Sequence, residues 1–98
     1  MKETKKIYFI EQTKSIEGSY IEIDTVSVAE TEADAVMEFE KLASGDCEKS
    51  FGYTLNEYEI SAEPTFFQRL IASWKKLPAD FYRKMQIITF RPIMEFQA

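Results

Sequence analysis

Residues 20–45, YIEIDTVSVAETEADAVMEFEKLASG, contain the pattern that decides the fold, a strand followed at once by a helix. Residues 20–29 largely alternate apolar and polar side chains, which is typical of a half-buried β-strand. Thr31 can cap the first turn of a helix, and the acidic residues after it favour the positive end of the helix dipole. Apolar residues then recur at helical spacing until a glycine stop: Val36, Phe39, Leu42, Ala43 and Gly45.

The strand at residues 20–29 contains one irregularity and has a partner before it in the chain. Its apolar positions slip by one residue near Asp24 and Thr25, which predicts a β-bulge there. Residues 6–13 form the preceding strand candidate, with apolar side chains on both faces. A turn that contains Gly18 joins the two segments, so we expect an antiparallel hairpin.

The second half of the chain predicts a strand, two helices and a final extended segment. Residues 51–60 form the strand candidate, and Thr65 is placed to cap a helix whose apolar stripe is expected to be core. Pro78 divides this helix from a shorter one at residues 79–86, because proline removes an intrahelical hydrogen bond. Residues 87–98 resemble a strand, and the proline among them limits this segment to an edge strand or an extended arm.

The order of elements is therefore ββαβαα, with a final strand as an option. Ninety-eight residues suit one hydrophobic core, so residues 1–98 are expected to form a single domain. We predict the α+β class, with a three- or four-stranded antiparallel sheet and two or three helices packed on one face of it.

The cysteine content and the N-terminus predict the compartment. Cys47 is the only cysteine, so no disulfide can form within the chain. Residues 7–10 are the apolar run after the charged N-terminus, and they are too short for a signal sequence or a membrane span. We expect a reduced compartment, the cytoplasm, and no membrane span.

The residue types that most catalytic and metal sites need are scarce. The chain has no histidine, which removes the usual general base and the commonest zinc ligand, and its three glycines are scattered. Cys47 follows a predicted helix and lies between acidic residues, which disfavours a reactive thiolate. The carboxylate pairs Glu22/Asp24 and Glu57/Glu59 are interpreted as solvated strand surface. We therefore predict no enzymatic activity, no cofactor and no metal site.

Charge is divided unevenly along the chain. Residues 1–63 contain six Lys/Arg and fifteen Asp/Glu, a net charge of −9, whereas residues 64–98 contain six Lys/Arg and two Asp/Glu, a net charge of +4. Either the basic part packs beside the acidic part and complements it, or one of the two surfaces meets a partner of opposite charge. The candidate acidic surface consists of Glu30, Glu32, Asp34, Glu38 and Glu40.

The leading hypothesis is a non-enzymatic protein-binding module that offers this acidic surface to a basic protein. Residues 26–35 are similar to a pattern common in short proteins of phages and mobile elements, a likeness that fixes no function. The scarcity of catalytic residue types and the polarised charge favour an inhibitor or an accessory protein of such an element. One alternative is a homo-oligomer, such as a homodimer paired through the final strand. The other is a nucleic-acid-binding accessory protein that uses a basic aromatic segment with Arg69, Lys75, Lys76, Arg83 and Lys84.

Overall fold

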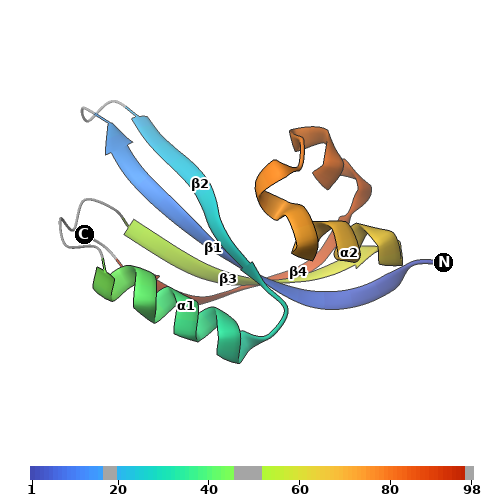
Figure 1. The fold of residues 1–98 in the computed structure, drawn as a ribbon, viewed down its shortest axis with the longest axis horizontal. Helices are drawn as coiled ribbons and strands as arrows, with labels where there is room; N and C mark the ends of the chain where they lie inside the picture. The colour runs from blue at the N-terminus through green and yellow to red at the C-terminus, as the bar shows by residue number, and fades with distance from the viewer. Residues whose placement is uncertain (17–19, 46–51, 97–98) are drawn as a thin grey trace.

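The computed structural model describes residues 1–16, 20–45 and 52–96 and shows a four-stranded antiparallel sheet with helices (Figure 1). The strands lie in the order β2-β1-β3-β4, so β1 and β3 are central. The predicted class, the antiparallel sheet and the predicted order of elements are confirmed. In chain order the elements are β1 (Glu3–Ile16), β2 (Tyr20–Ala29), α1 (Glu32–Gly45), β3 (Gly52–Ala62), α2 (Pro64–Ser73), the 3-10 helices η1 (Trp74–Lys76) and η2 (Ala79–Lys84), and β4 (Gln86–Phe96).

The helical region of the second half is more broken than predicted. α2 ends at Ser73, and the segment after Pro78 is a 3-10 helix instead of an α-helix. Proline disfavours helical backbone in the residue before it, and Leu77 is extended, with φ −80° and ψ 136°. The predicted cap at Thr65 is wrong, because α2 already begins at Pro64, whose fixed φ suits a first helical turn.

The strand ladders contain bulges, and the predicted one in β2 lies close to its expected place. Val26 is the extra residue there, between the paired residues Thr25 and Ser27. β4 contains two further irregularities, which leave Ile88 and Ile93 as extra residues against β3. Each bulge bends its strand and increases its twist, so the edge strand β4 is interrupted twice.

The two helices cover opposite faces of the sheet (Figure 1). Successive residues of β1 point to opposite faces. Tyr8 and Ile10 pack with Phe39 of α1, on what we call the α1 face. Ile7 and Phe9 pack with α2, on the α2 face. The prediction that the helices pack on one face is wrong, because four consecutive buried apolar residues in β1 need cover on both sides.

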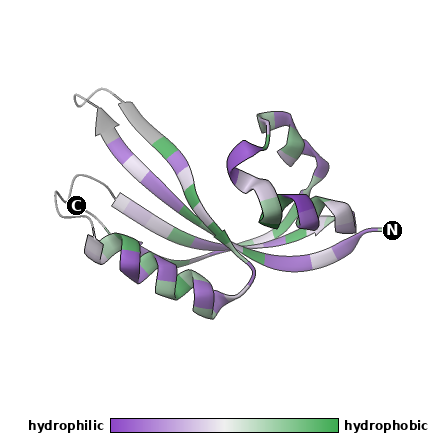
Figure 2. Cartoon of the chain, in the orientation of Figure 1, coloured by the Kyte–Doolittle hydropathy of each residue, from purple (hydrophilic) through white to green (hydrophobic). Residues whose placement is uncertain are grey.

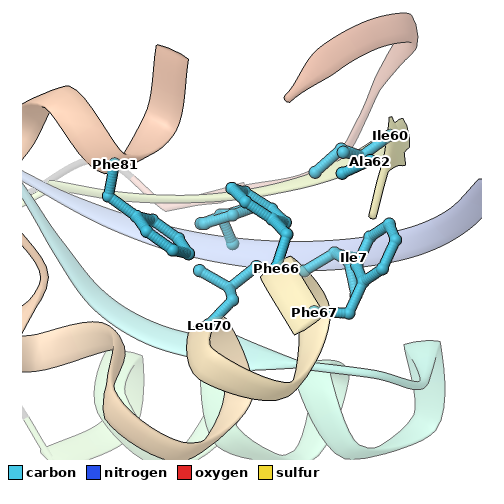
Figure 3. Close-up of a cluster of buried hydrophobic side chains, with 8 residues drawn as sticks. Ile7, Ile60, Ala62, Phe66, Phe67, Leu70 and Phe81 are labelled. Carbon is cyan, nitrogen blue, oxygen red and sulfur yellow. The ribbon is translucent and has the colours of Figure 1, made fainter. Parts of the chain in front are cut away.

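The core on the α2 face is aromatic and holds η2 in place (Figure 3). Phe66 of α2 stacks on Phe81 of η2, with ring centroids 4.5 Å apart and an interplanar angle of 6°. Leu70 and Ile7 are fully buried in the same cluster. Because Phe81 is only 3% exposed, this stack fixes η2 against α2 and keeps η2 over part of the α2 face.

The core on the α1 face is built around two buried residues of α1. Ala35 and Phe39 pack against Ile10 of β1 and Leu55 of β3. Figure 2 shows that hydrophilic and hydrophobic residues alternate along α1. The hydrophobic ones supply the contact with the sheet, so the other side of α1 stays exposed and carries its acidic residues.

Candidate functional site

The acidic residues predicted to bind a partner lie on α1 and on the turn before it. Glu30, Asp34 and Glu40 are exposed, and Glu38 is partly exposed. The hydroxyl of Thr31 accepts a hydrogen bond of 3.3 Å from the backbone N–H of Asp34, so the predicted helix cap is confirmed.

A shallow hollow on the surface of α1 brings three of these residues together. Asp34, Glu38 and Glu40 line this hollow together with Met37, which is 70% exposed. Met37 lies outside the predicted apolar stripe of this helix, so helical periodicity already places it on the solvent side. Lys41 and Ser44 also line this hollow, so its surface carries three carboxylates, one cation and one exposed apolar side chain.

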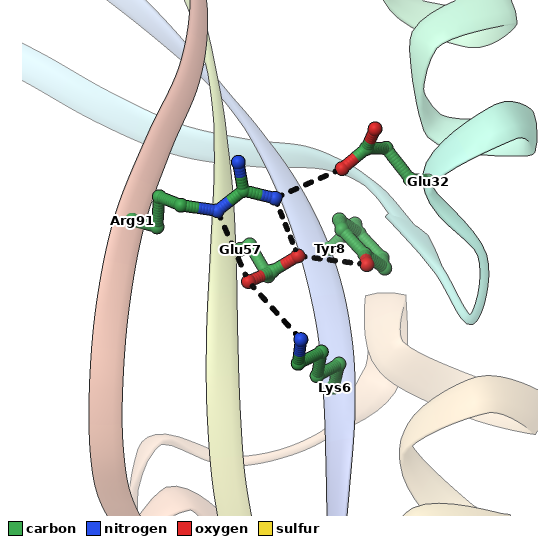
Figure 4. Close-up of polar contacts among 5 residues, drawn as sticks. All are labelled: Lys6, Tyr8, Glu32, Glu57 and Arg91. Atoms are coloured by element: carbon green, nitrogen blue, oxygen red, sulfur yellow. Dashed lines mark hydrogen bonds and ion pairs between the residues drawn. The ribbon is translucent and has the colours of Figure 1, made fainter.

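Glu57 of β3 is the centre of a polar network on the α1 face (Figure 4). Its Oε2 accepts hydrogen bonds from the Tyr8 hydroxyl and from Arg91 Nη2, both at 2.9 Å. Its Oε1 accepts a third bond from Arg91 Nε at 3.3 Å and lies 4.0 Å from Lys6 Nζ. Arg91 Nη2 also donates to Glu32 at 3.0 Å, so Glu32 turns toward the sheet and binds β4.

The network shifts the pKa values of its members. The hydrogen bonds from Arg91 and Tyr8 lower the pKa of Glu57 to about 2. Burial, together with the hydrogen bond to Glu57, raises the pKa of Tyr8 to about 12. Tyr8 and Arg91 lie directly opposite Glu57 on the two neighbouring strands, so the network ties β1, β3 and β4 together. Because its own arginine satisfies the carboxylate, we interpret this network as structural.

The interpretation of Glu57 and Glu59 as a solvated pair is wrong for Glu57. Glu57 is 6% exposed, whereas Glu59 is partly exposed. Only the pairing of the strands brings Tyr8 and Arg91 to Glu57, from 49 and 34 residues away in the chain. Spacing along the sequence therefore contains no signal for the network.

The oppositely charged parts of the chain are in contact, because β4 of the basic part pairs with β3 of the acidic part and α2 packs on β1 and β3. This contact agrees with the simpler of the two interpretations of the charge asymmetry, in which the basic part packs beside the acidic part. Arg91 of the basic part forms ion pairs with two residues of the acidic part, Glu32 and Glu57. The acidic residues of α1 and the basic residue of α2, Arg69, lie over opposite faces of the sheet.

The predicted basic surface is divided. Arg69 and Lys84 line one hollow, which also contains Glu63, whereas Lys75 and Lys76 line another hollow beside Trp74. Two of the cations also lie over aromatic rings of their own segment: Arg69 is 4.9 Å from the centroid of Phe81, and Lys75 is 5.4 Å from that of Trp74. Arg83 is exposed on η2.

The final segment forms an edge strand, with β3 on one side and no strand of the described residues on the other. Pro92 lies in this strand, and the two bulges interrupt its ladder with β3. These are features with which natural sheets limit pairing to a further strand.

Three further observations concern the described residues. Within residues 1–16, 20–45 and 52–96, no three His, Cys, Asp or Glu side chains gather where they could hold a metal ion. In the same ranges, the helices are too short or too polar to cross a membrane. Cys47, the thiol considered above, lies outside the described residues.

An apolar pocket on the α2 face was not predicted from the sequence. Its cavity volume is about 240 Å³, and η2 and all four strands contribute to its walls. Tyr58 of β3 lines the pocket, and the centroid of its ring lies 5.2 Å from the ring centroid of Phe9 and 5.2 Å from that of Phe90. Ile87 lines the pocket and is 47% exposed, and the neighbouring Phe90 is 54% exposed. The exposed apolar side chains of β4 therefore continue from the pocket to the edge of the sheet.

No protein-family model, curated protein or solved structure matches this chain. The function must therefore be argued from the surfaces themselves.

Proposed function

We propose that this protein is a non-enzymatic protein-binding module that docks through the α2 face. The observation that carries the proposal is the apolar pocket with Ile87 and Phe90 exposed beside it. Monomeric domains seldom expose neighbouring large apolar side chains next to a hollow unless a partner covers them. Protein interfaces place such side chains at their centre, surrounded by a polar rim.

The acidic surface of α1 has a supporting role in this proposal. The chain carries a net charge of −5, and three carboxylates of α1, those of Asp34, Glu38 and Glu40, outnumber the one cation beside them, Lys41. A net negative field attracts a positively charged protein and speeds its association. The proposed partner is therefore a basic protein. The proposed setting is the cytoplasm, as an inhibitor or accessory protein of a phage or mobile element.

The test is affinity capture of the tagged protein from a lysate of its source cells after nuclease treatment. Three baits are compared: the unmodified chain, Phe90→Ser and Met37→Ser. Both variants remove an exposed apolar side chain, but Phe90 adjoins the pocket and Met37 lies on α1 at the other face. We expect a stoichiometric protein that Met37→Ser retains and Phe90→Ser loses.

Other results contradict the proposal in different ways. A partner lost with Met37→Ser and kept with Phe90→Ser would place the contact on α1. Nucleic acid captured alone would favour the basic segment, and an empty capture or a second copy of this chain would remove the foreign protein partner.

A further inference from the structure

The apolar pocket contains one charged side chain among its walls. Three aromatic rings, those of Phe9, Tyr58 and Tyr82, line it together with Met85 of the segment after η2. Glu11 of β1 supplies the charge, and none of the described residues that line the pocket is a Lys or an Arg. An apolar pocket with aromatic walls and a single carboxylate favours a cation attached to an apolar stem.

The carboxylate of Glu11 is held by a tyrosine that also lines the pocket. The Tyr58 hydroxyl donates a hydrogen bond of 3.3 Å to Glu11 Oε1. Burial raises the pKa of Tyr58 to about 12, and the negative charge of Glu11 adds to this effect. The tyrosine is therefore a hydrogen-bond donor throughout the physiological pH range. None of the ion pairs between described residues includes Glu11.

On the opposite face of the sheet, an arginine completes a similar pair of a tyrosine and a glutamate. There the Tyr8 hydroxyl donates to Glu57, and the guanidinium of Arg91 donates two further hydrogen bonds to the same carboxylate (Figure 4). Both faces therefore hold a tyrosine–glutamate pair that joins β1 to β3. Only the pair on the α1 face has an arginine from its own chain.

We propose that the apolar pocket receives an arginine side chain of the partner protein. Its guanidinium bonds the carboxylate of Glu11, and its stem lies against the rings of Tyr58 and Tyr82. Arginine suits these walls better than lysine, because a guanidinium is weakly hydrated and stacks on aromatic faces. The cavity of about 240 Å³ is smaller than most sites for drug-sized ligands, which fits the insertion of one side chain.

This inference rests on the proposed function, since the arginine belongs to the docked protein, but it is tested without that protein. The probes are N-acetyl-arginine N-methylamide and the citrulline analogue, which has nearly the same shape and no charge. Binding to the full chain is followed by NMR of the methionine and isoleucine methyl groups. Signals of Met85 and Ile87 report on the pocket, and the signal of Met37 reports on α1.

We expect the arginine probe to shift Met85 and Ile87, leave Met37 unchanged and bind about tenfold more tightly than the citrulline probe. Glu11→Gln removes the charge at the pocket and should abolish this preference. Glu59→Gln is the matched control, because Glu59 also lies in the sheet but on the α1 face, and it should keep the preference.

Equal binding of the two probes, or shifts at Met37 alone, would overturn the inference. If the probes bind equally while Phe90→Ser still loses a captured protein, the protein-binding function stands and the arginine does not. If the arginine probe binds as expected and capture yields no protein, a free guanidinium compound is the occupant, and the docked arginine is wrong.

Discussion

The two faces of this sheet carry tyrosine–glutamate pairs that differ in one component. On the α1 face, the Tyr8 hydroxyl donates a hydrogen bond of 2.9 Å to the Glu57 carboxylate, which also accepts hydrogen bonds from Arg91. On the α2 face, the Tyr58 hydroxyl donates a hydrogen bond of 3.3 Å to the Glu11 carboxylate, and both residues line the apolar pocket. We call Tyr8–Glu57 the closed pair, because Arg91 of the same chain completes it, and Tyr58–Glu11 the open pair, because it faces the pocket.

This difference gives the two pairs different roles: the closed pair contributes to stability, and the open pair is proposed to bind a partner. A buried carboxylate without a cation is costly, so the closed pair has to be completed within the fold. Glu11 is only partly buried and water can solvate it, so the open pair tolerates the free state. The same chemistry therefore holds the strands together on one face and leaves a binding position on the other. Changes to the closed pair should affect stability, and changes to the open pair should affect binding.

The largest expected effect on the free energy of unfolding comes from removing the side chain that holds η2 beside the pocket. Phe81→Ala deletes a ring that is 3% exposed and stacked on Phe66, which should cost about 3–5 kcal/mol in the free energy of unfolding. Detached from α2, η2 would no longer hold Tyr82 over the pocket. Urea unfolding measures the cost, with Phe90→Ala as an exposed control of similar chemistry. A cost below about 1 kcal/mol would contradict the packing described for η2.

The two tyrosines provide the next test. Tyr8→Phe leaves Glu57 without one of its donors in a buried site and should cost about 1–3 kcal/mol in unfolding free energy. Tyr58→Phe removes the equivalent hydroxyl from a more open position and should cost less than about 1 kcal/mol. Both variants are compared by urea unfolding at neutral pH. Equal costs would remove the distinction between the closed and the open pair.

The acid dependence of stability tests the closed pair alone. The pKa of Glu57 is about 2 in the fold against an ordinary 4.5, so the unfolded chain binds more protons between these values. Its contribution to stability is present above about pH 5 and is lost as the pH falls toward 2. Glu57→Gln should reduce this acid loss by on the order of 1 kcal/mol. The control Glu59→Gln should keep the wild-type profile, and an unchanged profile in Glu57→Gln would show that another group is responsible.

The smallest expected effect concerns the acidic surface of α1. Reversing Glu38 and Glu40 to Lys should slow association with the captured partner several-fold and weaken its salt dependence, with little change in dissociation. Stopped-flow mixing or surface plasmon resonance at two salt concentrations measures this. An unchanged association rate would restrict recognition to the α2 face.

Most of the fold was accessible from the sequence because its signals are local. The alternation in residues 20–29 and the cap at Thr31 each act within a few residues, and the structure agrees with them. The placement of the helices was not accessible in the same way. Residues 7–10 showed apolar side chains on both faces, and this signal, taken further, indicates cover on both faces.

The candidate site depends on contacts between distant parts of the chain. The acidic residues of α1 could be predicted, because they are close in sequence and repeat along one helix. The pocket could not, since Phe9, Tyr58 and Tyr82 come from three elements and meet only after the strands have paired. Sequence also could not distinguish Glu57 from Glu11, because burial and the arrival of Arg91 decide their roles.

The most direct test of the central claim closes the open pair from within the chain. Thr25 of β2 lies directly opposite Glu11 and lines the pocket, so Thr25→Arg places a guanidinium where the partner's arginine is proposed to bind. Binding of N-acetyl-arginine N-methylamide is measured for this variant and for the neutral control Thr25→Gln. We predict that Thr25→Arg binds at least about tenfold more weakly than Thr25→Gln, while its thermal midpoint is no lower. Equal binding by the two variants would contradict the account.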